Sequence, residues 1–504
     1  MIAKPNPPVI LIDGESLTLE RAEDIAKGAK IVLANSVKNR MESSQKLVKE
    51  LAKGSAPIYG INTGFGYLAN QRISSNQLQT LQSNIIKSHS GGYGTPLPIS
   101  ETRLAMALRM NVLVKGFTGV RFALCQALMN LITAEIYPII PECGSVGASG
   151  DLAPLAHLAL PLLGLGDVYY KGNIVPAKQA LQEANLKPIK LVEKEGLSLI
   201  NGTQIMLAVG GLALTQAKKI IDLADKIAAV TYEGFGGNPN ALDPYLHELR
   251  GQTGQIESAA NILRELEGSS IFDAESKQKH MQDPYSLRCA PQIHGPSRDA
   301  IAYSYRIAET ELNAVTDNPL VFADQKKIVS GGNFHGQCLA MAFDFASMAI
   351  SEIANVSERR LELLLNPHMS GLPAFLTPRQ GVNSGYMVLQ YLSASIVNEN
   401  KLLANPSCTD SIPGNVGIED FVSMGMTSAR KLKKIVQNVR VVLTAEMLAA
   451  AQAIDLRKAR NLGQGTRKTY DAVRAVVPKL QNDRIIQEDI KQGLNVLKTL
   501  GNLL

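Results

Sequence analysis

The sequence predicts a mainly α fold, in which long helices form the core and glycine-rich loops gather at one end of it. Two observations support this class. Beyond about residue 200, apolar residues recur at steps of three and four, which is the period of a helix with one buried face. Alternating or β-branched strand patterns are scarce along the chain.

Turn signals dominate the first part of the chain, in glycine-rich stretches at residues 60–66, 91–94 and 144–151. The helical part follows. Residues 345–356 carry an apolar stripe at helical spacing, and residues 444–454 are strong helix formers, apolar on more than one face, as in a helix buried within a bundle. We therefore expect a loop-rich region at 1–200 and a helical-bundle region at 201–504, packed as one body.

The composition narrows the classes of partner. A chain of 504 residues with 45% hydrophobic residues can bury a large core. The net charge is +6, but the 51 basic and 45 acidic side chains are spread along the whole length, so no basic domain indicates a nucleic-acid partner. The one basic cluster, at residues 430–434, lies in a helical pattern and is interpreted as a solvated face.

The cysteines and the N-terminus indicate the compartment. Five scattered cysteines form neither a disulfide framework nor a zinc motif, which fits a reducing cytoplasm. The N-terminal stretch breaks its short apolar run with prolines and an aspartate, unlike a targeting peptide. No apolar run approaches the ~18 residues that span a bilayer, so no membrane partner is expected.

The stretch GSVGASGDLAPLAH, residues 144–157, sets three glycines, two serines and an aspartate in front of an apolar run. A Walker phosphate loop needs lysine where Asp151 stands, and a serine-hydrolase elbow needs glycine there. A dinucleotide fingerprint fails on spacing, and no histidine pair has zinc-helix spacing. The common structural alternative is a tight turn capped by Asp151 at the start of a helix.

A different chemistry fits the same residues. If the amide nitrogen of Gly150 reaches the carbonyl of Ala148, ring closure and loss of water from Ser149 leave an electrophilic exocyclic methylene. Small side chains allow that contact, and glycine supplies the unusual dihedrals. The stretch resembles the signature of the aromatic amino acid ammonia-lyases and aminomutases, in which this triad cyclises autocatalytically to 4-methylidene-imidazol-5-one (MIO).

The resemblance recurs in order along nearly the whole chain. Its further blocks are YGINTGFG (59–66), NGTQ (201–204), QDPYSLR (282–288), DNPL (317–320), GNFH (332–335) and EDFVSM (419–424). It implies a long-helix bundle of the fumarase/aspartase-like type and a homotetramer with active sites built from more than one subunit. It also implies a small amino acid substrate, with no metal and no dissociable cofactor.

The resemblance assigns roles to individual residues. Tyr59 would be the base, a phenol partly ionised by its surroundings so that it works near neutral pH. Tyr285 would assist the chemistry near the prosthetic group, and Arg288 would clamp the substrate carboxylate with its planar pair of donors. Outside this context Tyr59 would more often be a packing aromatic, and Arg288 a surface charge.

Four further residues carry over in supporting roles. Asn201 and Gln282 would give polar support to the substrate, and Phe334 would line the site beside the electrophile. Asp151 would promote the cyclisation rather than the elimination. Taken alone, Asn201 is also a plausible turn residue.

Two positions bear on the substrate. His89 follows Ser88, as in the Ser-His pair of histidine ammonia-lyases, although some tyrosine aminomutases share this pair. Glu419 is typical of histidine enzymes, because a carboxylate can hold an imidazole but would be an unpaired buried charge beside a phenyl ring. Its alternative role is capping a helix near Asn415. We therefore expect conversion of L-histidine to trans-urocanate and ammonia, with Glu419 among the catalytic residues.

Some positions depart from the histidine pattern. Phe421, Ile418 and Gly371 stand where histidine enzymes commonly carry histidine, glutamine and glutamine, and residues 333–337 look closer to tyrosine enzymes. A tyrosine or phenylalanine ammonia-lyase or 2,3-aminomutase is therefore the alternative within the family. An inactive helical scaffold is the alternative of another class, and the intact triad, Tyr59 and Arg288 argue against it.

Overall fold

The computed structural model describes residues 8–273, 281–459 and 461–504. The chain divides into two compact units, each made of three segments. The first comprises residues 1–215, 305–343 and 406–430, and the second comprises residues 216–304, 344–405 and 431–504. The boundary predicted at residue 200 falls close to the end of the first segment, but later parts of the chain also belong to the first unit.

Four long helices dominate the described chain, and they confirm the predicted mainly α class. They are α9 (Gln204–Phe235), α13 (Ala290–Leu312), α14 (Gln337–Leu365) and α17 (Gly425–Arg457). The sequence expectation for residues 345–356 and 444–454 is met, because these stretches lie inside α14 and α17.

Shorter helices and small sheets make up the rest of the first unit. Its helices are α1 (Leu19–Ala26), α2 (Val37–Ala52), α3 (Leu78–His89), α4 (Ile99–Leu113), α5 (Phe122–Thr133), α6 (Leu152–Ala159), α7 (Ala177–Glu183) and α8 (Glu195–Ile200). Strands β1 (Val9–Ile12) and β2 (Lys30–Leu33) pair in parallel. The antiparallel sheets are β3 (Tyr93–Pro96) with β5 (Pro141–Cys143), β4 (Tyr137–Pro138) with β6 (Asp167–Tyr170) and β7 (Asn173–Pro176), and β8 (Leu320–Phe322) with β9 (Lys327–Val329).

The packing of this unit brings distant loops together. Helix α4 is buried on all sides between α1 and α5, so it serves as the centre of the unit. Helices α3, α6 and α8 pack against one another. The last residue of α3, the start of α6 and the residue after α8 are His89, Leu152 and Asn201. All three line one cavity.

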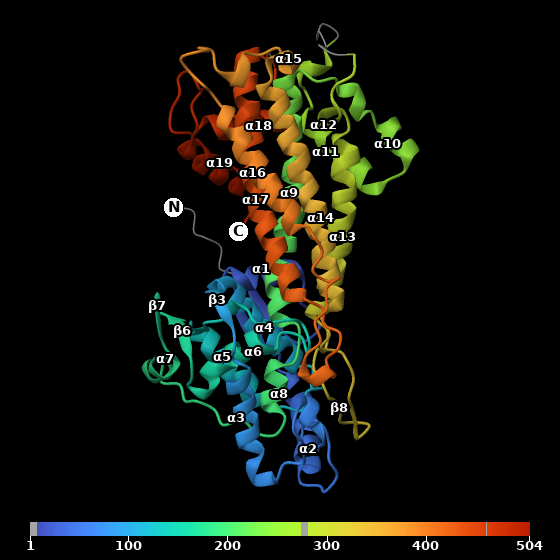
Figure 1. Cartoon of the computed structure of the whole chain (residues 1–504), viewed down its shortest axis with the longest axis vertical. Coiled ribbons are helices and arrows are strands. Elements are labelled where there is room, and N and C mark those ends of the chain that lie inside the picture. Colours follow the sequence, from blue (N-terminus) through green and yellow to red (C-terminus); the bar gives the residue numbers. More distant parts are fainter. Residues whose placement is uncertain (1–7, 274–280, 460) are drawn as a thin grey trace. The chain divides into compact units, whose positions relative to one another are not determined.

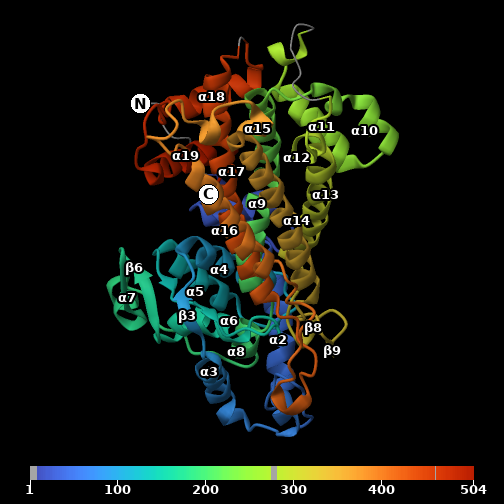
Figure 2. The same ribbon diagram turned by 45° about the horizontal axis from the view of Figure 1, so that its top comes forward.

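In the second unit, parts of the four long helices run side by side (Figures 1 and 2). The surrounding helices are α10 (Pro244–Arg250), α11 (Thr253–Glu265), α12 (Tyr285–Arg288), α15 (Pro367–Ser370), α16 (Met387–Leu403), α18 (Gln464–Arg474) and α19 (Ile486–Gly501). Buried alanine, leucine and valine side chains fill the space between the long helices.

A buried polar network also joins the four long helices. Arg360 of α14 donates two hydrogen bonds to Glu446 of α17, from Nε to Oε1 at 2.6 Å and from Nη2 to Oε2 at 3.0 Å. Thr231 of α9 donates to the same carboxylate at 2.7 Å. His294 of α13 bonds Asp225 of α9 through Nδ1 at 2.7 Å, and burial lowers its pKa, so its neutral ring can accept from Arg360 Nη1 at 3.2 Å. Each buried charge in this network is therefore paired.

Helix α14 corrects one expectation from the sequence. By length and composition it could cross a membrane, although no membrane-length apolar run was expected. Within the fold, 67% of its apolar window is buried. A core helix of a globular protein meets the same two criteria, because its apolar faces pack on neighbouring helices rather than on lipid.

Replacing Arg360 by Met tests the buried network. We expect a loss of about 3 to 5 kcal/mol of stability, because the carboxylate of Glu446 would stay buried without its cation. Thermal unfolding at fixed protein concentration would measure the loss as a lowered midpoint. Lys491→Met on α19 is the control, since the Lys491 side chain is 56% exposed and its partner Glu488 is 58% exposed. Equal midpoints for the two variants would contradict the role of the pair.

Candidate active site

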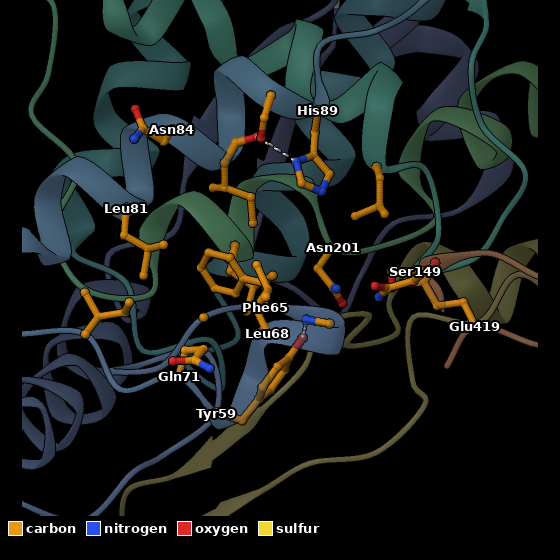
Figure 3. A pocket seen from close by; sticks show the side chains of 18 residues that line it. Tyr59, Phe65, Leu68, Gln71, Leu81, Asn84, His89, Ser149, Asn201 and Glu419 are labelled. Atoms are coloured by element: carbon orange, nitrogen blue, oxygen red, sulfur yellow. Dashed lines mark hydrogen bonds between the residues drawn. The ribbon is translucent and has the colours of Figure 1, made fainter. Parts of the chain in front are cut away.

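A cavity of about 470 Å³ in the first unit brings together five of the residues that the sequence singled out (Figure 3). Its walls come from the segment at residues 59–73, from α3, from the start of α6, from α8 and from the loop at 415–419. Tyr59, His89, Ser149, Asn201 and Glu419 all line it. Residues as far apart in the sequence as Tyr59 and Glu419 thus share one pocket.

The loop that carries Ser149 is held by an unusually close backbone contact. Gly150 has a φ of +73°, and a Cβ atom at this position would lie 2.0 Å from the carbonyl oxygen of Gly202. Gly202 N donates to the carbonyl oxygen of Ser149 at 3.2 Å, and Asp151 N donates to the carbonyl oxygen of Gly202 at 2.6 Å. Only glycine can occupy position 150, both for its dihedral angle and for the space.

Asp151 caps a different helix from the one that the turn interpretation assigned to it. It precedes α6 but makes no side-chain cap there. Its buried carboxylate accepts instead from the N–H groups of Ile205 at 3.0 Å and Met206 at 2.8 Å, in the first turn of α9. Ser145 Oγ donates to the other carboxylate oxygen at 2.9 Å. Burial raises the pKa of Asp151 to about 7, although these three hydrogen bonds act in the opposite direction.

The surroundings of Tyr59 differ from the expectation of a phenol ionised near neutral pH. Burial raises the pKa of Tyr59, and the carboxylates of Glu419 and Asp317 raise it further. The N–H of Gly66, which donates to the phenol oxygen at 3.5 Å, acts against them. The described residues of this chain therefore favour the neutral phenol, because its two charged neighbours are both anionic.

Buried charges lie behind the cavity wall. The guanidinium of Arg109 on α4 is fully buried and donates through Nη1 to the carbonyl oxygen of Asn201 at 2.7 Å and to Gln204 Oε1 at 2.8 Å. Lys194 and Asp317 form a fully buried ion pair at 2.7 Å. These contacts fix the backbone around Asn201 and α8.

Asn201 and His89 present polar atoms to the cavity. Within the described residues, Asn201 Oδ1 is buried without a hydrogen-bond partner, so it is an acceptor open to a bound molecule. His89 Nδ1 lies 2.9 Å from the carbonyl oxygen of Ile85, which can only accept, so Nδ1 carries the proton. In the neutral ring, Nε2 is then the acceptor.

Glu419 lies in a tight loop ahead of α17. That helix begins at Gly425, so Glu419 is not in its first turn, and the short 3₁₀ helix at Asn415–Gly417 has no side-chain cap, so Glu419 caps neither helix. Glu419 Oε1 accepts instead from the side-chain amide of Asn415 at 3.2 Å. Asn415 itself lines the cavity and was not identified as a site residue from the sequence.

Ala148, Gly150 and Asp151 adjoin Ser149 but do not line the cavity themselves. Four other residues assigned by resemblance lie outside its wall. Phe334 is half-buried in the first unit, outside the cavity wall. Gln282, Tyr285 and Arg288 belong to the second unit, where the guanidinium carbon of Arg288 lies 4.9 Å from the centre of the 70% exposed Tyr285 ring. Arg288 Nε is buried without a hydrogen-bond partner within the described residues. Their roles in the site stay predictions.

Sequence reasoning missed Arg109, the Lys194–Asp317 pair and Asn415. Arg109 lies inside α4, Lys194 in the turn before α8 and Asp317 in the loop before β8, and a charged residue is normally placed on the surface. The residue type of Asn415 was the available indication in the sequence. Asparagine is one of the few residues besides glycine that tolerate a left-handed backbone, and Asn415 adopts one, with a φ of 49°.

Comparison with known proteins places this site in a class. Residues 17–475 match the family described as aromatic amino acid lyase, and the chain belongs to that family. It is a carbon–nitrogen lyase, and its substrate is an amino acid.

Individual relatives give a finer picture. A histidine ammonia-lyase of Myxococcus xanthus is 47% identical over 498 residues, which cover 99% of this chain and 98% of the relative. A crystal structure of histidine ammonia-lyase from Trypanosoma cruzi is 40% identical, with a TM-score of 0.91 over 98% of this chain and 94% of that one. Tyrosine aminomutase from Streptomyces globisporus is 34% identical, with a TM-score of 0.93 over 98% of each chain.

The electrostatics of Tyr59 can be tested directly. We expect Glu419→Gln to lower the pKa of Tyr59, because a nearby carboxylate disfavours the negatively charged phenolate and the neutral amide does not. Phenolate absorbance would be followed against pH, and the absorbance of the same protein carrying Tyr59→Phe would be subtracted to isolate Tyr59. The midpoint of the remaining titration should move to lower pH. Glu183→Gln, on the exposed side of α7, is the control and should leave the midpoint where it is. An unmoved midpoint in Glu419→Gln would show that this carboxylate does not act on the phenol.

Proposed function

We propose that this protein is a histidine ammonia-lyase, which converts L-histidine to trans-urocanate and ammonia in the cytoplasm as a homotetramer. One observation carries the proposal. His89 and Glu419, the two residues that favour histidine, line the same cavity as Ser149 and Tyr59. The 47% identity to a histidine ammonia-lyase over nearly the whole chain supports it.

The loop at residues 148–150 fits the MIO group. Ring closure needs small residues and a compressed turn, and Gly150 lies against Gly202 where no side chain fits. The buried Asp151 holds the loop against α9. When formed, the group would supply an electrophile that activates the amino group as a leaving group.

The residues around the cavity would remove the β-proton, bind the amino group and recognise the ring of the substrate. Tyr59 would accept the β-proton of the substrate as the phenolate, a form that the Gly66 N–H favours and that burial and the carboxylates of Glu419 and Asp317 disfavour. Asn201 Oδ1 would accept a hydrogen bond from the substrate ammonium. His89 Nε2 and the Glu419 carboxylate are both acceptors, so either could receive the single N–H of a neutral imidazole, and the protonated ring could donate to both. An unsubstituted phenyl ring could use neither.

The carboxylate end of the substrate would need a cation. Arg288 is the proposed clamp, because its guanidinium has a buried donor that is free among the described residues. Tyr285 beside it would assist, with Gln282 and Phe334 as polar support and lining residue. Together with the proposed homotetramer, this assignment would assemble each site from more than one subunit.

A tyrosine aminomutase or a related tyrosine or phenylalanine enzyme is the second candidate. The specific observation in its favour is Phe421, whose ring stacks on His335 at 6.1 Å between centroids, where histidine enzymes commonly carry histidine. The TM-score of 0.93 to a tyrosine aminomutase supports the same alternative.

Replacing Ser149 by Ala should abolish turnover, because the methylene carbon of the proposed group comes from this side chain. The fold should persist, since among the described residues the Ser149 hydroxyl makes no hydrogen bond that holds the loop. Intact-mass measurement checks the cause: wild-type protein should be lighter than its sequence by two water molecules, and the variant should not be. Full activity in the variant would overturn the prosthetic-group assignment.

The substrate can be determined with purified protein in separate incubations with L-histidine, L-tyrosine and L-phenylalanine, following ammonia and the ultraviolet absorbance of the product. We expect turnover of histidine alone. Glu419→Gln should lower its kcat/KM by about 10- to 100-fold, as expected for loss of a charged hydrogen-bond partner. Its thermal midpoint should change little, because Glu419 lies half-buried on a loop. An unchanged kcat/KM on histidine in Glu419→Gln would contradict the role of Glu419 in choosing the substrate. Coumarate or cinnamate as the product of the wild type would favour the second candidate.

A further inference from the structure

The loop that presents Glu419 to the cavity is closed by a strained turn. Gly414 N donates to the carbonyl oxygen of Glu419 at 2.9 Å, and Gly417 N donates to that of Gly414 at 2.9 Å. Between them Asn415 and Val416 have φ values of 49° and 55°. A left-handed conformation is costly for a β-branched residue, so the surrounding contacts must hold this turn in place.

The side chain of Asn415 joins this turn to the segment that carries Tyr59. Its Oδ1 accepts from the backbone N–H of Tyr67 at 3.2 Å, and its Nδ2 donates to Glu419 Oε1 at 3.2 Å. The orientation of the amide follows from these partners, because a backbone N–H can only donate and must face the oxygen.

Gly66 completes the connection. Its N–H donates to the phenol oxygen of Tyr59 at 3.5 Å, and its backbone lies so close to Asn415 that a Cβ would come within 2.1 Å of Nδ2. A continuous chain of contacts therefore runs from the phenol through Gly66 and Tyr67 to Asn415 and the carboxylate of Glu419. Tyr59, Gly66, Asn415 and Glu419 all line the same cavity.

We infer that Asn415 is a positioning residue, which sets the separation and direction of the Tyr59 phenol and the Glu419 carboxylate. The inference rests on the proposed function, in which these two groups act on the β-carbon and the ring of one substrate. A fixed separation matters because proton transfer and ring recognition must occur in a single bound geometry. Asn415 touches neither reacting atom in this scheme.

The test begins with Asn415→Gly, which tolerates the left-handed backbone but removes both side-chain hydrogen bonds. We expect kcat/KM to fall by about 10- to 100-fold, with kcat lowered and KM raised, since both groups lose their alignment. Asn185→Gly is the matched control: Asn185 has a φ of 55°, lies after α7 and does not line the cavity. The Asn185→Gly variant should keep the wild-type kcat and KM. Intact mass should show the loss of two waters in both variants.

A double-mutant cycle separates positioning from folding. In Asn415→Asp one oxygen can still accept from Tyr67 N, but a second carboxylate then faces Glu419. We expect Asn415→Asp to cost much less kcat/KM in a Glu419→Gln background than in the wild type, because the amide that replaces the Glu419 carboxylate could donate to the new aspartate. Equal costs in the two backgrounds would overturn the inference, and so would unchanged constants in Asn415→Gly. If Asn415→Gly does not fold, the cycle alone decides.

The wild type distinguishes this inference from the proposed function. If it deaminates tyrosine rather than histidine, the proposed function fails, and the same variants measured on tyrosine decide the role of Asn415. If histidine is the substrate and Asn415→Gly keeps wild-type constants, only the inference fails.

Discussion

The backbone contact between Gly150 and Gly202 is the constraint around which the first unit is arranged. It brings the 144–151 loop within hydrogen-bonding distance of the start of α9, and it leaves no room for a side chain at Gly150. Asp151 closes the arrangement, because its carboxylate accepts from the free N–H groups that begin α9. Arg109 then holds the carbonyl of Asn201 from the other side. The functional loop is thus anchored to a long helix rather than free at the surface.

Much of this could be predicted from the sequence, for physical reasons. Helical periodicity marks α14, because burying one face of a helix imposes a spacing on the apolar residues. Strong helix formers that are apolar on more than one face mark α17. The glycines at 144–151 likewise predict a tight loop, since only glycine tolerates backbone contacts as close as that between Gly150 and Gly202. The sequence could not predict which helix Asp151 would cap. The neighbour in sequence, α6, offers the same free N–H groups as α9, and only tertiary packing chooses between them.

The same limit applies to the electrostatics. The motif predicts that Tyr59 lines a cavity. It does not predict whether the neighbouring groups raise or lower the pKa of its phenol. Glu419 and Asp317 arrive from segments far along the chain, and both disfavour the phenolate. The buried pairing of Asp317 with Lys194 has no signature in the chain either, because neither residue has a neighbour in sequence that marks it as buried. Long-range pairing, rather than local pattern, determines how charges act on this site.

The cavity divides into parts that differ in how freely they can change. Beside Ser149, the backbones of Gly150 and Gly202 are in tight contact, so almost any substitution at these two glycines displaces the chain. The end lined by Leu68, Gln71, Leu81 and Asn84 is made of side chains on a short 3₁₀ segment and on α3, which can be exchanged without moving the backbone. Divergence of substrate preference, in nature or in directed evolution, can therefore accumulate at that end while the reactive end is inherited intact. A mutant library aimed at new amino acids is best confined to those four positions.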